Sequence, residues 1–137
     1  MSEPVLLDTC ALVWIANGDE ITARCRERVV DAAREDRINV SPISAWEIAS
    51  LQSRNRLTLT MPVLTWFDRF IAAQGVVLAA MPPNLLIESL SLPGKPPADP
   101  ADRILLATAR EYDLTLITRD QALLDYAGEG FVRALRC

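Results

Sequence analysis

Short apolar runs alternate with helical patterns along this chain of 137 residues, and that alternation constrains its fold more than any other feature. The runs cover residues 4–8, 38–41, 76–81 and 114–118, followed by an edge strand over 131–135. Strands separated by helices pair in parallel, because each helix returns the chain to the same end of the sheet. The sequence therefore predicts an α/β fold of three layers, with a central, mostly parallel sheet covered by helices on both faces.

The expected helices begin at recognisable capping residues. Ser41-Pro42 and Asp99-Pro100 each place a capping side chain before a proline at the first helical position. Asp19 is the expected cap of the second helix. We expect helices over 9–17, 20–34, 42–53, 62–74, 82–90, 101–112 and 121–125, with a proline-rich loop over 91–100. No linker or repeat interrupts the alternation, so we expect a single domain over residues 1–137.

Composition narrows the class of protein. Half of the residues are apolar, which is enough for a real core, and no apolar run approaches the length of a membrane span. The acidic start runs directly into a strand and does not resemble a signal peptide. The three cysteines lack the CxxC spacing of zinc sites, so we expect reduced thiols in a cytoplasmic protein with no membrane partner. The net charge of −4 argues against coating nucleic acid by charge alone.

The chain contains no histidine. This absence excludes Ser-His-Asp and Cys-His nucleophilic sites, histidine acid–base pairs and the HExxH zinc site. The chemistry that remains for an enzyme of this size is carboxylate chemistry, most simply carboxylates that hold a hard divalent cation.

Four carboxylates occupy positions that a parallel sheet would bring to one rim. Asp8 ends the first run, and Asp120 follows the fourth run by two residues. Glu47 lies in the helix after the second run, and Asp102 lies in the first turn of the helix that leads into the fourth. Ligands of open parallel sheets collect outside the carboxyl ends of the strands. We therefore expect the four side chains to converge there.

Convergent carboxylates repel one another and raise each other's pKa values. A Mg²⁺ or Mn²⁺ ion would remove that repulsion, and in nucleases such ions activate water and neutralise charge on the phosphate oxygens. The sequence leaves open whether one ion or two would bind.

Each acid also has a structural explanation. Asp8 could cap the helix that begins at residue 9, Asp99 and Asp102 could form a capping pair, and Asp120 could cap the helix after it. Taken singly, these explanations are favoured. The presence of four acids on one rim favours the functional interpretation.

Glu47 has the weakest structural explanation, because its neighbours Trp46 and Ile48 are expected to be buried. Trp14, Trp46 and Trp66 are interpreted as core or interface residues and not as platforms for bases.

Two threonines and four arginines complete the candidate site. Thr9 and Thr118 adjoin Asp8 and Asp120, where a hydroxyl could orient a carboxylate or a water molecule, or simply belong to a strand end. The candidate contacts to phosphate or RNA are Arg54, Arg56, Arg103 and Arg119. For the last two, pairing with the neighbouring acids or with solvent is the simpler interpretation.

Four segments together resemble a known family. LLDTCALVW, SAWEIA, DPADRILLATA and LITRD, in this order and spacing, resemble the PIN-domain ribonucleases, in particular the VapC toxins of type II toxin–antitoxin pairs. The resemblance extends over essentially the whole chain. It implies a PIN-like α/β/α fold, Mg²⁺- or Mn²⁺-dependent endonucleolytic cleavage of RNA, a cognate antitoxin that occludes the site, and a homodimer.

The resemblance also assigns roles by position. It places the catalytic acids at Asp8, Glu47, Asp102 and Asp120, and it adds Asp99 to the metal ligands Asp8, Asp102 and Asp120. Where many members have histidine ahead of the DPxDR motif, this chain has Pro97-Ala98. The helices around Gly18 and over 61–70 are where the family would place dimer or antitoxin contacts, although those faces could equally be core.

Three other functions remain open. The chain could be an RNA-processing PIN nuclease outside a toxin system, or a protein-binding module without catalysis. It could also transfer phosphate through an aspartyl phosphate at Asp8, which is disfavoured because the second acid expected two residues on is replaced by Cys10 and because Lys95 is poorly placed. The identities of the RNA and the antitoxin are not encoded in any motif.

Overall fold

The computed structural model describes residues 2–137 and contains one five-stranded sheet. The strands are β1 (Val5–Leu7), β2 (Ile38–Val40), β3 (Val76–Leu78), β4 (Thr115–Thr118) and β5 (Arg133–Arg136). Their order is β3-β2-β1-β4-β5, and every neighbouring pair is parallel. The predicted α/β fold class is confirmed, and the sheet is parallel throughout.

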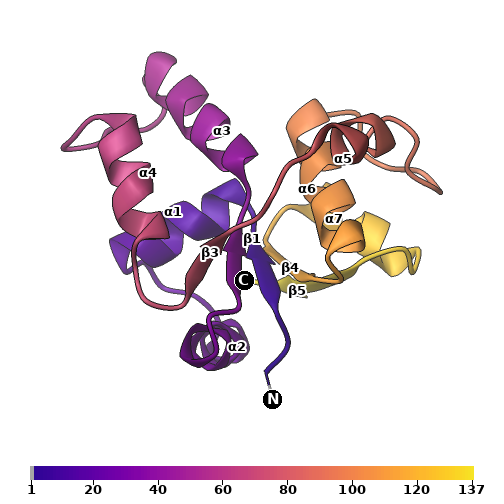
Figure 1. Ribbon diagram of the computed structural model, residues 1–137, viewed down its shortest axis with the longest axis horizontal. Coiled ribbons are helices and arrows are strands. Elements are labelled where there is room, and N and C mark those ends of the chain that lie inside the picture. Colours follow the sequence, from indigo (N-terminus) through magenta and orange to yellow (C-terminus); the bar gives the residue numbers. More distant parts are fainter. Residues whose placement is uncertain (1) are drawn as a thin grey trace.

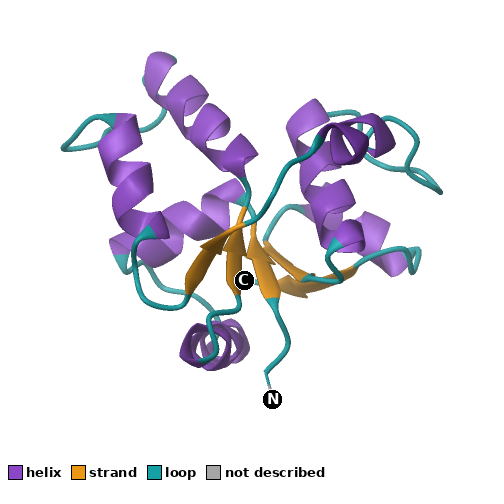
Figure 2. Ribbon diagram, viewed as in Figure 1, coloured by secondary structure: helices purple, strands orange, loops and turns teal. Residues whose placement is uncertain are grey.

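Helices cover both faces of this sheet. They are α1 (Thr9–Asn17), α2 (Ala23–Arg34), α3 (Pro42–Ser53), α4 (Val63–Ile71), α5 (Pro83–Glu88), α6 (Pro100–Glu111) and α7 (Gln121–Gly128). Helices α1, α3 and α4 lie on one side of the sheet, and α5, α6 and α7 lie on the other (Figures 1 and 2). None of the helices within residues 2–137 combines the length and the apolar character needed to span a membrane.

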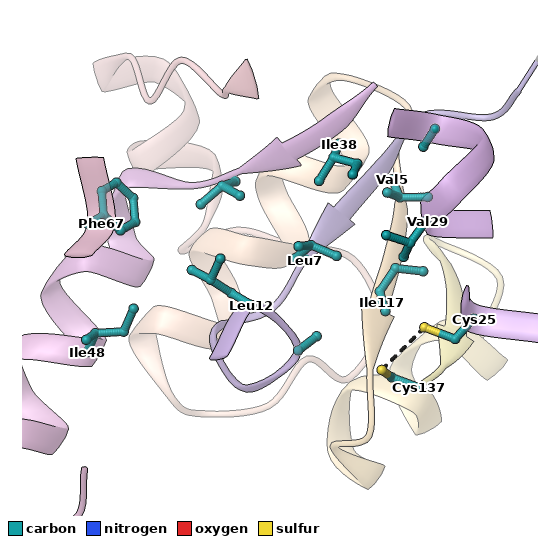
Figure 3. Close-up of a cluster of buried hydrophobic side chains, with 13 residues drawn as sticks. Val5, Leu7, Leu12, Cys25, Val29, Ile38, Ile48, Phe67, Ile117 and Cys137 are labelled. Carbon is teal, nitrogen blue, oxygen red and sulfur yellow. Dashed lines mark hydrogen bonds between the residues drawn. The ribbon is translucent and has the colours of Figure 1, made fainter. Parts of the chain in front are cut away.

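The side chains of the central strands alternate between two cores. Val5 and Leu7 of β1 pack against helices α1 to α4, together with Ile117 of β4 (Figure 3). Leu6 and Leu116 point to the opposite face and pack with residues of α6 and α7. Alternation with a period of two, with both faces apolar, is the pattern of a strand buried on both sides. It also determines the face to which each residue at the end of a strand points.

Several boundaries differ from the prediction. Helix α2 is capped by Thr22, whose hydroxyl accepts a hydrogen bond from the Cys25 N–H at 3.1 Å, and not by Asp19. Helix α4 ends at Ile71, four residues before Gly75, and β3 is shorter than the apolar run that contains it. Helix α7 continues to Gly128 because buried Tyr126 extends its apolar face.

Candidate active site

The four predicted acids face one cavity of about 310 Å³ at the carboxyl ends of the strands. It is lined by Asp8, Thr9, Cys10, Trp14, Glu47, Asp102, Leu105, Arg119 and Asp120. The acids reach it from four separate segments of the chain, as the parallel topology requires. Asp99 is not among the lining residues.

Asp8 is held at the junction of β1 and α1. Its Oδ1 accepts a hydrogen bond of 2.7 Å from the Ala11 N–H and thereby caps the helix. Its Oδ2 accepts a hydrogen bond of 2.5 Å from the Thr118 hydroxyl. The Thr118 oxygen in turn accepts the Asp120 N–H at 3.0 Å. One hydroxyl at the end of β4 therefore orients both the carboxylate of Asp8 and the backbone that carries Asp120.

Glu47 enters the cavity from α3. The Thr9 hydroxyl donates a hydrogen bond to Glu47 Oε1 and lies 3.0 Å from the Ser44 hydroxyl. The expectation that both neighbours of Glu47 are buried is half wrong: Ile48 is buried, but Trp46 is 63% exposed. Residues three or four positions apart lie on the same face of a helix. Ser44 and Ile48 therefore share the buried face of α3, and Trp46 points outward.

Asp99 and Asp102 have different surroundings although both belong to the start of α6. Asp99 Oδ2 accepts the Asp102 N–H at 2.9 Å and caps the helix. Within residues 2–137, the Asp102 carboxylate itself accepts no hydrogen bond. It is half-buried and faces the cavity beside Leu105, one turn further along the helix.

Capping explains part of the position of three acids. Asp120 caps α7 through hydrogen bonds from the Ala122 and Leu123 N–H groups, at 2.8 and 3.4 Å, while Asp8 and Asp99 cap α1 and α6. The capping explanation is therefore correct for Asp8, Asp99 and Asp120, whereas Asp102 takes part only through its backbone N–H. An ionised carboxylate offers about four lone-pair positions, however, and a cap occupies only part of them. The remaining lone pairs of Asp8 and Asp120 are available to the cavity that both acids line.

Burial and mutual repulsion raise the pKa values of three acids in the cavity. Burial, and after it the charges of Asp99, Asp120, Glu47 and Asp8, together raise the pKa of Asp102 from its ordinary value of 3.8 to about 7. Burial also raises the pKa of Asp8 and of Glu47, against the opposing effect of the hydrogen bonds that Thr118 and Thr9 donate.

These donors fit a hard divalent cation. Mg²⁺ prefers carboxylate oxygens, keeps several of its waters and often binds through one or two carboxylates, and the charge of a bound ion would favour the ionised form of Asp102. Within residues 2–137, no three acidic or cysteine side chains are already gathered into an ion-binding cluster. The cavity therefore suits an ion that retains water better than an ion enclosed by protein ligands.

One of the four predicted arginines reaches the cavity. The Arg119 guanidinium lies 3.8 Å above the centre of the Trp14 ring and donates to the backbone oxygens of Glu20 and Cys137, at 2.8 and 3.2 Å. Arg103 instead donates to the Pro97 oxygen at 2.8 Å. The exposed residues Arg54 and Arg56 lie just beyond the end of α3 and do not line the cavity.

Sequence reasoning missed the contribution of Trp14 and Cys10. Trp14 packs against the core, as predicted, but it also lines the cavity and supports Arg119, which the sequence did not indicate. Both residues lie on α1, four positions apart, and residues with that spacing share one helix face. Cys10 lies two positions after Asp8, at the start of the helix, and is therefore close to the rim. The spacing of four residues then places Trp14 on the same side of the helix as Cys10.

Comparisons with known proteins agree with this architecture. The family model described as PIN domain matches residues 5–129. Ribonuclease VapC22 from Mycobacterium tuberculosis is 32% identical over 119 residues, which cover 87% of this chain and 88% of that protein. The crystal structure of FitAcB from Neisseria gonorrhoeae has a similar fold, with a TM-score of 0.55 and 19% identity over 96% of each chain.

Proposed function

The chain belongs to the PIN domain family, and on that premise we propose that it is a metal-dependent endoribonuclease and the toxin of a toxin–antitoxin pair. The observation that carries the proposal is the cavity lined by Asp8, Glu47, Asp102 and Asp120, with the pKa of Asp102 raised by burial and by the other acids. The similarity to a VapC ribonuclease over most of both chains supports RNA as the substrate and an antitoxin as the partner.

Asp8, Asp102 and Asp120 are the proposed ligands of Mg²⁺ or Mn²⁺. When bound, such an ion supplies the positive charge that activates a water molecule and neutralises the phosphate oxygens. Asp8 and Asp120 are preorganised for this role because Thr118 contacts both residues. Asp99 was expected among the ligands, but its carboxylate caps α6 outside the cavity lining, and we assign it an electrostatic influence on Asp102.

Glu47 is the proposed proton acceptor for the attacking water. Its pKa is raised by burial and by the nearby Asp99 and Asp8 charges, which moves it toward the range useful for general base catalysis. The Thr9 hydroxyl holds Oε1, so the other carboxylate oxygen is free to face the cavity.

Arg119 is the proposed contact to an RNA phosphate. It is the arginine that lines the acidic cavity, and two backbone carbonyls and the Trp14 ring hold its guanidinium plane in place. Two of its five N–H donors are used in those contacts, which leaves donors for phosphate oxygens. The charge of Arg119 also offsets part of the repulsion that the carboxylates would exert on RNA.

Metal-dependent RNA cleavage is the direct test of this function. The purified protein should cut a structured RNA in the presence of Mg²⁺ and stop when the ion is chelated. The Asp8→Asn and Asp102→Ala variants should retain the circular dichroism spectrum of the wild type and lose cleavage. Cleavage that persists after chelation, or in folded Asp8→Asn, would overturn the metal mechanism.

The toxin assignment has a separate test. Induced expression in cells should arrest growth, and co-expression of a small protein encoded by a neighbouring gene should restore it. Mapping RNA ends after induction, with Asp8→Asn as the control, would identify the RNA that is cut. A nuclease that is active in vitro but harmless in cells and without such a neighbour would instead be an RNA-processing enzyme. Cytoplasmic location and a homodimer remain part of the proposal, and gel filtration with light scattering would test the dimer.

A further inference from the structure

Two of the three cysteines meet inside the core that contains β1. Cys25 of α2 is fully buried, and Cys137, which follows β5, is 2% exposed. Their sulfur atoms lie 3.3 Å apart, with the Cys25 thiol donating to the Cys137 sulfur (Figure 3). The two residues are 112 positions apart in the sequence. The proposed nuclease chemistry uses neither thiol.

Both cysteines are placed by hydrogen-bonded secondary structure. The Cys137 N–H donates to the Thr118 oxygen at 2.9 Å and continues the pairing of β5 with β4. Cys25 lies in the first turns of α2, where its N–H is capped by Thr22. Cys10, by contrast, is exposed and lines the acidic cavity. The geometry therefore selects one pair out of the three that are conceivable.

We propose that Cys25 and Cys137 form a reversible disulfide when the protein meets a low-molecular-weight disulfide such as oxidised glutathione. One protein thiolate attacks a glutathione sulfur, breaks that S–S bond and releases one glutathione thiolate. The second protein thiolate then attacks the mixed disulfide, closes the bond between Cys25 and Cys137, and releases the second glutathione. The two protons lost by the cysteines are taken up by the two glutathione thiolates, so two protein thiols are oxidised and one small disulfide is reduced.

The bond requires only a small movement. A disulfide has sulfur atoms about 2.05 Å apart, so the pair must close by about 1.2 Å from its present separation of 3.3 Å. Strand β5 lies at the edge of the sheet and pairs with β4 alone, so it can shift without breaking hydrogen bonds to a second strand. Movement of this edge also gives the oxidant access to the buried pair.

The reaction is slow in the native state. Burial, and then the hydrogen bond with Cys137, raises the pKa of Cys25 to about 12, and burial raises the pKa of Cys10 to about 11. Little thiolate of either residue exists at neutral pH, and thiolate is the attacking species. Geometry, not acidity, therefore decides which cysteines pair.

Closing the bond would join α2 to the residue after β5 and would enclose most of the sequence in one covalent loop. A crosslink that closes a loop this long restricts the unfolded state strongly and stabilises the folded one. It would also anchor the carbonyl of Cys137, which accepts the Arg119 N–H at the acidic cavity. The oxidised protein should therefore be the more stable form. This inference does not depend on the proposed nuclease activity.

Peptide mapping of the full chain tests the proposal. The protein is incubated with oxidised glutathione at about pH 8.5, alkylated in denaturant, and digested after glutamate without reduction. We expect residues 21–27 and 130–137 to appear as one crosslinked peptide that dithiothreitol separates. The melting temperature should rise by roughly 6–12 °C on oxidation and return on reduction.

Matched variants identify the pair. Cys10→Ser should still show the crosslink and the shift in melting temperature, whereas Cys25→Ala and Cys137→Ala should lose both. The wild-type peptide map remains decisive if either alanine variant fails to fold. The proposal is overturned if the oxidised wild type carries glutathione on separate cysteines, links Cys10 instead, or leaves Cys25 and Cys137 open to alkylation. A crosslink without a rise in melting temperature would overturn the stabilising role.

Discussion

The Thr118 hydroxyl donates a hydrogen bond of 2.5 Å to Asp8 Oδ2, across the neighbouring ends of β4 and β1. Both residues are buried. Burial raises the pKa of Asp8, and the hydrogen bond from Thr118 opposes this by lowering it. A residue with no direct place in the chemistry thus keeps the first acid closer to its ionised form.

Thr118→Val tests this relationship, since valine has nearly the same shape without the hydroxyl. The variant leaves Asp8 Oδ2 without its donor and the Asp120 N–H without its acceptor, which should cost about 1–3 kcal/mol of unfolding free energy. Loss of a group that orients a metal ligand should lower cleavage by about 10–100-fold. Urea unfolding and cleavage kinetics measure the two effects, and Thr118→Ser, which keeps the hydroxyl, is the control. Equal behaviour of the valine and serine variants would contradict the role of this bond.

The acidic cavity should make the metal-free protein less stable as the pH rises. The pKa of Asp102 is 3.8 in the unfolded chain and about 7 in the folded protein. Between these values the folded state holds about one more proton than the unfolded state, so the free energy of unfolding falls with rising pH. Above about pH 7 both states are ionised and this contribution becomes constant. The raised pKa values of Asp8 and Glu47 act with the same sign.

Urea midpoints from pH 5 to 8 in the presence of a chelator measure this slope. The Asp102→Asn variant cannot ionise at that position and should show a flatter profile, with greater stability than the wild type at pH 8. A profile for the variant that parallels the wild type would show that Asp102 titrates normally.

Mg²⁺ should reverse this loss of stability and should distinguish Asp102 from Asp99. An ion that binds only the folded state raises the melting temperature, by several degrees at concentrations well above its dissociation constant. Asp102→Asn should lose most of that rise, because it removes a proposed ligand. Asp99→Ser should keep it, because serine still caps α6. If Asp99→Ser loses the Mg²⁺ response as fully as Asp102→Asn, Asp99 is itself a ligand. Calorimetric titration would measure the same difference directly.

Local rules predicted the elements whose signals are local. Helices α1 and α3 have the predicted bounds because Asp8 and Ser41-Pro42 are caps that act within one turn. The predicted cap of α2 was wrong because Asp19 and Thr22 both have side chains suited to capping. The choice between them depends on the direction of the chain after Gly18, which has a left-handed conformation. The approximate positions of all five strands could be predicted from the apolar runs. Their parallel pairing could be predicted from the alternation of these runs with helices.

The rim position of the acids was predictable for the same topological reason, but their environment was not. The contact of Arg119 with Trp14 and the meeting of Cys25 with Cys137 each depend on side-chain directions between distant segments. No spacing in the sequence encodes such contacts. The family resemblance added the expected chemistry of the rim, and the PIN domain match confirms the family.

The stack of Arg119 on Trp14 gives the last prediction, which concerns substrate binding. Arg119→Lys keeps the charge but loses the planar fork and its stacking on the indole, so the KM for RNA should rise by about tenfold with a smaller change in kcat. Trp14→Leu should raise KM in the same direction, since the guanidinium loses its support, and Trp14→Phe should retain part of the effect.

The coupling between the two residues separates positioning from a general loss of packing. In a double-mutant cycle with Trp14→Leu and Arg119→Lys, we expect a coupling free energy of about 0.5–2 kcal/mol in kcat/KM, the range of a cation–π contact. Additive losses would show that the ring does not position the guanidinium for RNA. A change confined to kcat would indicate that Arg119 acts in the chemical step and not in phosphate binding, because an interaction made only in the transition state leaves KM unchanged.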